Sequence, residues 1–248
     1  MMWKSKRNIQ ENSKVACAVT SLEGLETYVF KGDFKEFQYK GELVEKANNK
    51  PLFKYNAYTG VRGVGIISVK KTYPPFKMIN LSMITNALKI KIGKGKVNSY
   101  PENETEIKIK SFLHPRIINS FKGLLSLKAM AFIDEDDYPM ILPLTSISPK
   151  KNGQRLVFAF SGMKKYIEKI PLLSKVAICI FKMKSDKNLL SLMMSDKIPL
   201  GVVQPVAYQL KGRFKGINKF RGVHLGIIDL EEVYSASPPL CGQLIVQI

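Results

Sequence analysis

The sequence is poor in the residues that build metal centres and catalytic triads. Its 248 residues include only two histidines, His114 and His224, and three cysteines without a CxxC spacing. A Cys/His metal cluster or a Ser-His-Asp triad therefore has too few members to draw on. A sparse and odd number of cysteines also favours reduced thiols over a disulfide framework. We expect a cytoplasmic protein without a bound metal.

Long apolar runs and nucleotide-binding loops are missing as well. No apolar run approaches the roughly 18 residues that a membrane-spanning helix needs, and no apolar core follows the basic N-terminal residues, as it would in a signal peptide. Gly60–Gly65 leads into a strand-like run instead of a helix, so it is not a dinucleotide-binding fingerprint. We therefore expect no membrane segment and no such fingerprint.

Acidic residues are scarce beside basic ones. Lysine and arginine total 39 against 20 acids, which gives a net charge of +19, and no acid occurs between Glu45 and Glu102. A basic field attracts phosphate, whether in a cofactor or in a nucleic-acid backbone. The lysines are scattered and form no recognisable nucleic-acid motif, which favours a solvated surface. Nucleic acid is therefore a possible partner but not the favoured one.

The stretch from Phe121 to Ile147 is the start of a regular β pattern that continues through the rest of the chain. Two apolar runs flank the acidic turn Asp134–Asp137, a pattern typical of a β-hairpin. The turn lacks the spacing of a calcium loop, so a solvated turn is favoured over a cation site. Arg155–Phe160 and Lys175–Phe181 read as two further strands. The pattern predicts an antiparallel β module that runs to the C-terminus.

Three strand-like blocks occur twice in the same order, which we interpret as an internal duplication. The blocks begin at Ser13, Tyr28 and Gly65 in the first copy and at Ser174, Tyr208 and Gly226 in the second. Gly32 and Gly212 occupy matching places, where a glycine inside a strand suggests a bulge or a close backbone approach. Each copy carries its own insertion, Phe37–Thr59 in the first and Met183–Val203 in the second.

The first copy is predicted to be incomplete. Residues 1–75 would hold the back half of a module without its front half, residues 76–117 would form a connection, and residues 118–248 a complete module. Within the connection, Pro115 suits the first turn of a helix. A half-module leaves strand edges and an apolar face uncovered. It is therefore expected to complete itself against the second module or in a homodimer.

A basic link precedes the first repeated block of each copy and is the best candidate site. Hydroxyls and adjacent cations at a strand-to-helix corner can bind phosphate through charge-assisted hydrogen bonds and helix N–H groups. A solvated surface loop is the alternative interpretation, because lysine pairs are common in such loops. The residues of the link are Ser161, Lys164 and Lys165 in the second copy and Lys6, Arg7 and Asn8 in the first.

Three segments resemble the FMN-binding split barrel of the pyridoxamine 5′-phosphate oxidase superfamily. These are the hairpin AFIDEDDYPMILPL, the link SGMKKYIEKIPLLSKVAICI and the strand YQLKGRF. Lys6–Val15 is similar to the family's link, with Ser13 where proline is usual. The resemblance implies a mainly β (α+β) fold, a six-stranded antiparallel Greek-key split barrel. This barrel would be duplicated, with a partial first copy, and generally dimeric.

The resemblance also implies FMN in a cleft between barrels. The family's phosphate contacts fall on Ser161, Lys164 and Lys165, with Lys6, Arg7 and Asn8 as the matching positions of the first copy, while Pro143 and Thr145 would lie near the isoalloxazine. Two positions depart from the family pattern: Asp137 replaces the usual turn glycine, and Lys169 stands where asparagine is common. These departures leave a cofactor-free descendant open.

The resemblance favours a flavin-binding protein of the oxidoreductase type, with an open substrate and a deazaflavin as the alternative cofactor. The chemistry would be the cofactor's own, with the protein supplying position and electrostatics. A second hypothesis is a cofactor-free barrel whose lysine-rich surface binds nucleic acid or a protein partner. A third is a truncated, inactive product of a longer gene. A yellow purified protein would favour the first hypothesis.

Overall fold

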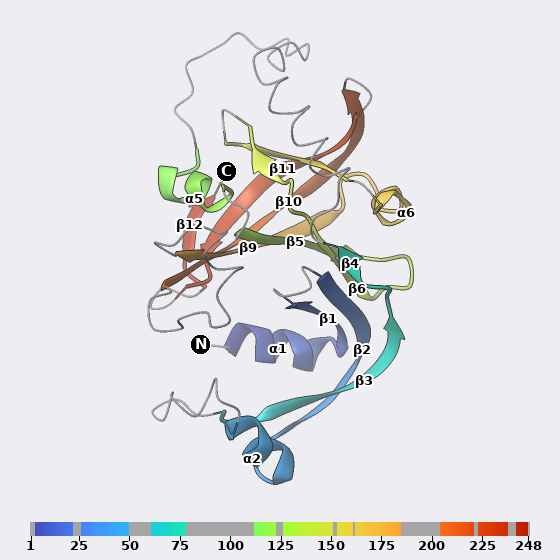
Figure 1. Cartoon of the computed structure of the whole chain (residues 1–248), viewed down its shortest axis with the longest axis vertical. Helices are drawn as coiled ribbons and strands as arrows, with labels where there is room; N and C mark the ends of the chain where they lie inside the picture. Colours follow the sequence, from blue (N-terminus) through green and yellow to red (C-terminus); the bar gives the residue numbers. More distant parts are fainter. Residues whose placement is uncertain are drawn as a thin grey trace, which may run out of the picture.

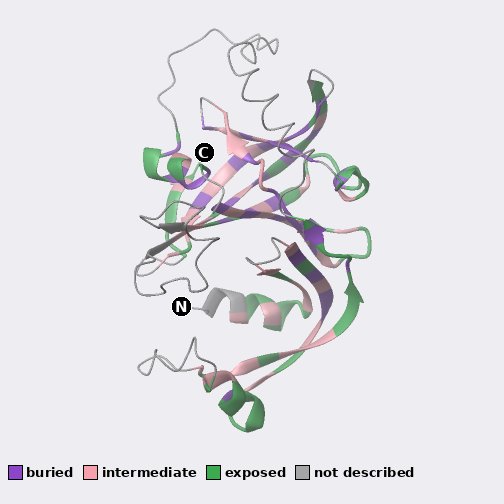
Figure 2. Cartoon of the chain, in the orientation of Figure 1, coloured by how far each residue is buried: buried purple, intermediate pink, exposed green. Residues whose placement is uncertain are grey.

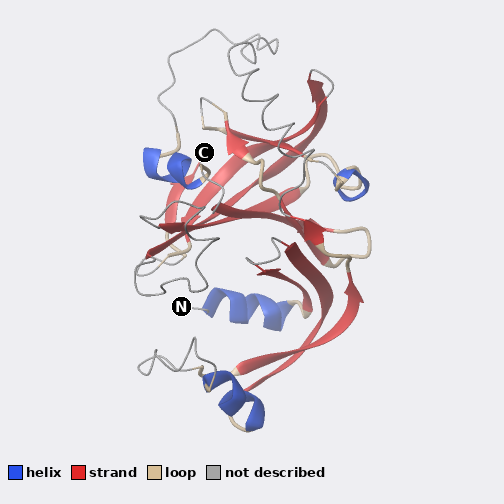
Figure 3. Cartoon of the chain, viewed as in Figure 1, coloured by secondary structure: helices blue, strands red, loops and turns tan. Residues whose placement is uncertain are grey.

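The computed structural model describes residues 3–21, 26–49, 61–77, 112–122, 126–150, 153–160, 162–184, 204–220, 223–237 and 242–247. Within these ranges the chain is mainly antiparallel β-structure arranged in two sheets (Figures 1 and 3). No helix in these ranges is long and apolar enough to cross a membrane. The expected connecting sequence LSMITNALKIKI and most of the Met183–Val203 insertion lie outside the described residues.

The first sheet has the strand order β1-β2-β3, with β4 pairing with the start of β2. Helix α1 precedes this sheet, and helix α2 lies between β2 and β3 in the chain. Buried positions alternate with more exposed ones along the first half of β2, as expected for a strand with one covered face; the buried ones are Thr27, Val29 and Lys31. The bounds are α1 (Trp3–Glu11), β1 (Lys14–Ser21), β2 (Glu26–Gln38), α2 (Glu42–Asn48), β3 (Val64–Thr72) and β4 (Phe76–Lys77).

The second sheet has the strand order β6-β5-β9-β10-β11-β8-β7, with β12 pairing with β11. Helix α5 precedes it, and helix α6 lies in the crossover from β8 to β9. The bounds are α5 (Pro115–Ser120), β5 (Ser126–Ile133), β6 (Pro139–Pro143), β7 (Ser148–Pro149), β8 (Arg155–Ala159), α6 (Lys164–Ile167), β9 (Lys175–Lys184), β10 (Gln204–Phe220), β11 (Val223–Ser235) and β12 (Leu244–Gln247).

The second sheet closes on itself. Strands β6 and β7 stand at opposite ends of the strand order, yet only residues 144–147 separate them in the chain. Ser146 fastens this junction, because its Oγ donates to the Ala159 carbonyl at 2.6 Å and accepts from the Ala159 amide at 3.1 Å. The six longer strands β6-β5-β9-β10-β11-β8 therefore form an antiparallel barrel. The predicted mainly β, antiparallel barrel fold is confirmed, whereas its duplication stays an interpretation.

The predicted hairpin is present as β5 and β6, with Met130 opposite Leu142 and Phe132 opposite Met140. These four apolar side chains are buried in the barrel core. Lys128 follows the same inward alternation, and its Nζ donates to the Phe121 carbonyl at 2.9 Å. Burial and the nearby Lys182 lower the pKa of Lys128 to about 8. Lys128 is the one charged residue among the buried positions of β5.

The helix predicted to begin at Pro115 is also present. His114 caps it, because its Nδ1 accepts from the Arg116 amide at 3.2 Å. Proline suits this first turn because its missing N–H has no intrahelical acceptor there. The helix ends at Ser120, and residues 123–125 lie outside the described ranges.

The repeated blocks fold into strands with the same order and register. Strands β1-β2-β3 correspond to β9-β10-β11, and in both sets the ladder shifts just before the matching glycine. Added Cβ atoms on Gly32 and Gly212 would lie 2.1 Å from the carbonyl oxygens of Ser68 and Asp229, respectively. This close backbone approach explains both glycines. The corresponding pairs include Val15–Gly32 with Val176–Gly212, Gly32–Val69 with Gly212–Leu230, and Phe37–Gly65 with Ile217–Gly226.

One pair of matching positions carries an ion pair with its charges exchanged. Asp33 lies 3.5 Å from Lys70 in the first sheet, and Arg213 lies 2.6 Å from Glu231 in the second. The first pair joins β2 to β3, and the second joins the corresponding strands β10 and β11. The correspondence therefore extends from backbone register to side-chain pairing, which supports our interpretation of a duplication.

The two sheets share one buried core (Figure 2). Val29, Tyr73 and Phe76 of the first sheet belong to the same apolar cluster as the barrel residues. Tyr166 of α6 contacts two of them, with ring centroids 5.9 Å from Tyr73 and 5.6 Å from Phe76. The expected interface between the halves is therefore present within one chain. The homodimer stays a prediction.

Candidate functional site

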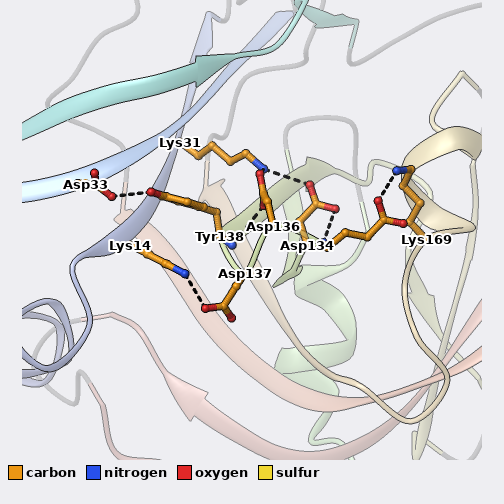
Figure 4. A network of polar contacts seen from close by, with 9 residues as sticks. Lys14, Lys31, Asp33, Asp134, Asp136, Asp137, Tyr138 and Lys169 are labelled. Carbon is orange, nitrogen blue, oxygen red and sulfur yellow. Dashed lines mark hydrogen bonds and ion pairs between the residues drawn. The ribbon is translucent and has the colours of Figure 1, made fainter.

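The acidic turn between β5 and β6 docks on the first sheet (Figure 4). Lys31 of β2 contacts the carboxylates of both Asp134, at 3.2 Å, and Asp136. Lys14 of β1 lies 2.6 Å from Asp137. The prediction of a solvated turn is wrong for Asp134, whose side chain is only 17% exposed. The turn is instead a contact between the two halves of the chain.

Lys31 lies at the centre of this contact, with only 2% of its side chain exposed. Its ammonium stands 5.6 Å from the ring centre of Tyr73 and 5.7 Å from that of Tyr138. Burial lowers the pKa of Lys31. Its hydrogen bonds to the carboxylates of Asp136 and Asp134 outweigh the effect of burial, so the pKa is raised. Lys31 is therefore a charged residue at neutral pH, held between carboxylates and aromatic rings.

Two further polar contacts extend the junction. The Tyr138 hydroxyl donates to Asp33 at 2.7 Å, and the Lys169 ammonium donates to Glu135 at 2.5 Å. Tyr138 and Glu135 belong to the second half of the chain, whereas Asp33 belongs to the first. We call the group the acidic-turn junction; its residues are Lys14, Lys31, Asp33, Asp134, Asp136, Asp137 and Tyr138. Both lysines of the group pair with its aspartates, which is the arrangement of a structural contact. Among the described residues, no group of His, Cys, Asp and Glu could hold a metal ion.

The structure does not bring all the predicted cofactor-binding residues of the second copy together. Lys164 and Lys165 lie exposed on α6, where Lys164 pairs with Glu168 at 3.5 Å and Lys165 stands 5.0 Å above the Tyr166 ring. Ser161 lies outside the described residues. Two other predicted residues sit on the β6 side of the barrel: Pro143, buried at the end of β6, and Thr145, half-buried in the following turn.

The first-copy site residues Lys6, Arg7 and Asn8 lie together on α1. Arg7 pairs with Glu11 at 3.6 Å on the exposed side of the helix. The Lys6 ammonium stands 5.6 Å from the Phe37 ring centre and 5.3 Å from that of Tyr39. Figure 1 shows α1 below the barrel and α6 on its right flank, so the two basic links are separate surfaces.

The two basic links also differ in their position along the repeat. Lys6 stands seven positions before Ser13, and the buried Ile167 stands seven positions before the matching Ser174. Lys6 therefore corresponds to Ile167 and not to a lysine of α6. In the sequence the two links were matched because both are basic. The register of the folded strands matches residues at equal distance from the first repeated block, which gives a different correspondence.

A cavity of about 430 Å³ opens between α1 and β2. Its aromatic wall contains Phe34 and Phe37, whose ring centres are 4.6 Å apart, and continues to Tyr39, 6.3 Å from Phe37. The volume falls within the range of about 300–1,000 Å³ that is usual for small-molecule sites. The lining residues are Ile9, Gln10, Ser13, Phe34, Lys35, Glu36, Phe37 and Tyr39.

Sequence reasoning missed this cavity. The two copies differ here, because the second has Pro171-Leu172-Leu173 where the first has Gln10-Glu11-Asn12. A Cβ on Gly216 would lie 2.8 Å from the Leu172 Cδ2, and the first copy has Glu36 at the position of that glycine. Leu172 and Leu173 are 70% and 53% exposed, so the segment gives no sequence signal for a cavity in the first copy.

The barrel topology defines the class of protein as a six-stranded antiparallel β-barrel with a second, smaller sheet docked on it. No protein-family model and no curated protein matches the sequence. Solved structures of split-barrel and flavin reductase proteins are similar to about half of the chain.

Three of these structures show the extent of the similarity. HupZ from Group A Streptococcus is 13% identical, with 53% of this chain and 100% of that chain covered and a TM-score of 0.34. A pyridoxamine 5′-phosphate oxidase-like protein from Lactobacillus delbrueckii is 17% identical, with coverages of 50% and 95% and a TM-score of 0.33. The flavin reductase of styrene monooxygenase from Pseudomonas putida is 9% identical, with coverages of 50% and 86% and a TM-score of 0.29.

Proposed function

We propose that this chain is a flavin-binding protein of the oxidoreductase type and that the α1 cavity holds the flavin, with FMN the favoured form. The observation that carries the proposal is the combination of an aromatic wall with a cation at its rim. Lys6 stands over the rings of Phe37 and Tyr39 beside the cavity. An isoalloxazine ring whose side chain ends in a phosphate matches this pair of features.

The residues present fit the two ends of FMN. Phe34 and Phe37 offer ring faces and edges to an isoalloxazine. Lys6 and Lys35 offer ammonium groups to a phosphate, and Gln10 offers an amide. A bound flavin supplies electron-transfer chemistry, while these side chains bind and orient it. The proposal places the site on the first sheet, beside the basic link that the resemblance named.

Helix α6 is the second place where the flavin phosphate could bind. Lys164 and Lys165 are exposed there, next to the aromatic contact of Tyr166 with the first sheet. The cation pair supports this alternative, and the resemblance placed the phosphate on the same two lysines. Each site has two lysines, of which one stands over an aromatic ring, so paired substitutions can separate the two sites.

The test begins with the absorbance spectrum of the purified chain and continues with an FMN titration followed by flavin fluorescence. The double variant Lys6→Ala/Lys35→Ala should weaken FMN binding at least about tenfold, because each charge-assisted hydrogen bond contributes roughly 1.5–3 kcal/mol. The double variant Lys164→Ala/Lys165→Ala is the matched control, since it removes the same net charge. It should leave FMN affinity unchanged.

Each other outcome has a clear meaning. Weakening by the α6 pair alone would move the phosphate to Lys164 and Lys165. A colourless chain that does not bind added FMN would contradict the flavin proposal. The same titration with a deazaflavin and with FAD compares the cofactors, and oxidation of a nicotinamide donor tests the oxidoreductase assignment. Light scattering of the full chain tests the homodimer.

A further inference from the structure

The first sheet has an uncovered edge whose equivalent in the second sheet is paired. In the second sheet, Leu225–Asp229 of β11 pairs with Arg155–Ala159 of β8. The matching segment of the first sheet is Val64–Ser68 of β3, which has only β2 as its ladder neighbour among the described residues. Figure 1 shows β3 at the outer margin of this sheet. Within the described part of the chain, the segment therefore presents backbone N–H and C=O groups that have no partner strand.

The side chains of β3 are apolar at several positions where the matching side chains of the paired strand β11 are also apolar. Val64, Ile67 and Val69 match Leu225, Ile228 and Leu230 in the register of the two sheets. Leu225, Ile228 and Leu230 are 3%, 0% and 4% exposed, whereas Val69 is 51% exposed and the other two first-sheet residues are half-buried. The first sheet thus retains apolar side chains suited to a covering strand.

The other edge of the first sheet is not equally open. Strand β1 corresponds to β9, which pairs with β5 in the barrel. In the first sheet, β1 lies against β6 of the same chain through the acidic-turn junction. The β3 edge is therefore the better place for a partner.

The charges around β3 indicate the chemistry of the partner. Arg62 precedes the strand, and the exposed Lys71 stands near its end. Two copies of this chain that paired through β3 would bring these cations together and repel each other. A strand with acidic residues at its ends would be attracted instead. Charge complementarity thus favours a different polypeptide over a second copy.

We propose that β3 is the docking edge for an apolar strand of a partner protein with acidic residues at its ends. The strand adds antiparallel to β3, opposite Val64–Ser68, where β8 pairs with β11 in the second sheet. Backbone hydrogen bonds provide affinity, and the apolar side chains on the two faces of β3 set the register. Arg62 and Lys71 select the acidic ends. This binding is independent of flavin.

The probe is a synthetic peptide with the Leu156–Phe160 sequence between two glutamates at each end. Hydrogen exchange of the full chain, read by mass spectrometry, should slow over residues 64–72 when the peptide is added. The variant Arg62→Glu/Lys71→Glu should weaken peptide binding about tenfold, because two attractive charge pairs become repulsive. Lys219→Glu, on the exposed part of β10, is the control and should leave the peptide affinity unchanged.

Three results would overturn the proposal. A dimer whose β3 amides are protected without peptide would show that a second copy occupies the edge. A monomer with the same protection would show that the chain covers its own edge. Free exchange over residues 64–72 that peptide does not slow would show an edge that binds no strand. If Arg62→Glu/Lys71→Glu fails to fold, Lys71→Glu alone is compared with Lys219→Glu, with the same direction expected.

Discussion

Replacement of Lys31 by methionine tests whether the acidic-turn junction holds the two halves together. Lys31→Met keeps a long apolar side chain but removes the ammonium that contacts Asp134 and Asp136. Lys31 is 2% exposed, so its aliphatic stem continues to pack after the substitution. The change therefore removes a charge with little loss of buried apolar surface.

The expected loss follows from the burial of the three groups. Removing one partner of a buried ion pair costs about 3–5 kcal/mol, because the other charge is left without compensation. Here the side chains of Asp134 and Asp136 retain 17% and 46% exposure, so water solvates part of the remaining charge. We expect a decrease in the free energy of unfolding of about 3 kcal/mol, at the low end of that range.

The assay is urea unfolding of the full chain at neutral pH, followed by near-ultraviolet circular dichroism. Lys14→Met is the matched control, because it also removes one lysine from the junction. Lys14 and Asp137 are 32% and 76% exposed, so this variant should lose at most about 1 kcal/mol. Equal losses in the two variants would refute the reasoning, since burial would then not distinguish the two ion pairs.

The same variant should respond to pH in a defined way. Burial raises the pKa of Asp136, but its hydrogen bonds to Lys31 and the Tyr138 amide outweigh this, so its folded-state pKa is lowered. Its stabilisation is therefore present above the unfolded pKa of about 3.9 and is lost as the pH falls through the folded value. Because the pKa of Lys31 is raised in the folded state, the stabilisation by its charged form is lost only at strongly alkaline pH. The difference between wild type and Lys31→Met should be constant from about pH 5 to 10 and shrink below about pH 4.

Two further predictions concern the barrel. Burial lowers the pKa of Lys128 to about 8, which penalises the folded state while this lysine is charged. The free energy of unfolding should therefore rise between about pH 8 and 10.4, by about 3 kcal/mol at about 1.4 kcal/mol per pKa unit. Lys128→Met should remove this rise in urea titrations, and parallel pH profiles for the two proteins would contradict the assignment. In the second prediction, Gly226→Ala should lower the unfolding midpoint more than Gly65→Ala, with a cost of about 1–3 kcal/mol for overpacking. A Cβ would lie 2.2 Å from Phe158 in the first case and 3.3 Å from Phe34 in the second; equal thermal melts would contradict it.

Local pattern was sufficient to predict much of the fold. The apolar runs around Asp134–Asp137 predicted the β5–β6 hairpin, because alternation and a polar turn are properties of adjacent residues. Comparison of the two copies predicted strands with the same order and the matching glycines Gly32 and Gly212. Both glycines lie where a neighbouring carbonyl leaves no room for a Cβ. These features depend on the chain's own periodicity and on its repeat.

Composition alone was a poorer guide to the site. It grouped Lys6 with Lys164 and Lys165 as basic links, but only the folded helices show that Lys6 stands beside aromatic rings and a cavity. The α6 lysines instead lie exposed near Tyr166. The surroundings of a lysine depend on which strand lies under its helix, and that strand is distant in the sequence.

The strands of the repeated blocks, their matching register and the hairpin turn follow from spacing along the chain, so residue order is enough to predict them. The contact of the acidic turn with the first sheet depends on the fold. Lys31 and Asp134 are 103 residues apart, yet the turn places them 3.2 Å from each other. The same four acids would be a solvated turn on an isolated hairpin. They become a junction because the first sheet brings a buried lysine to them, and a buried charge requires partners of opposite sign.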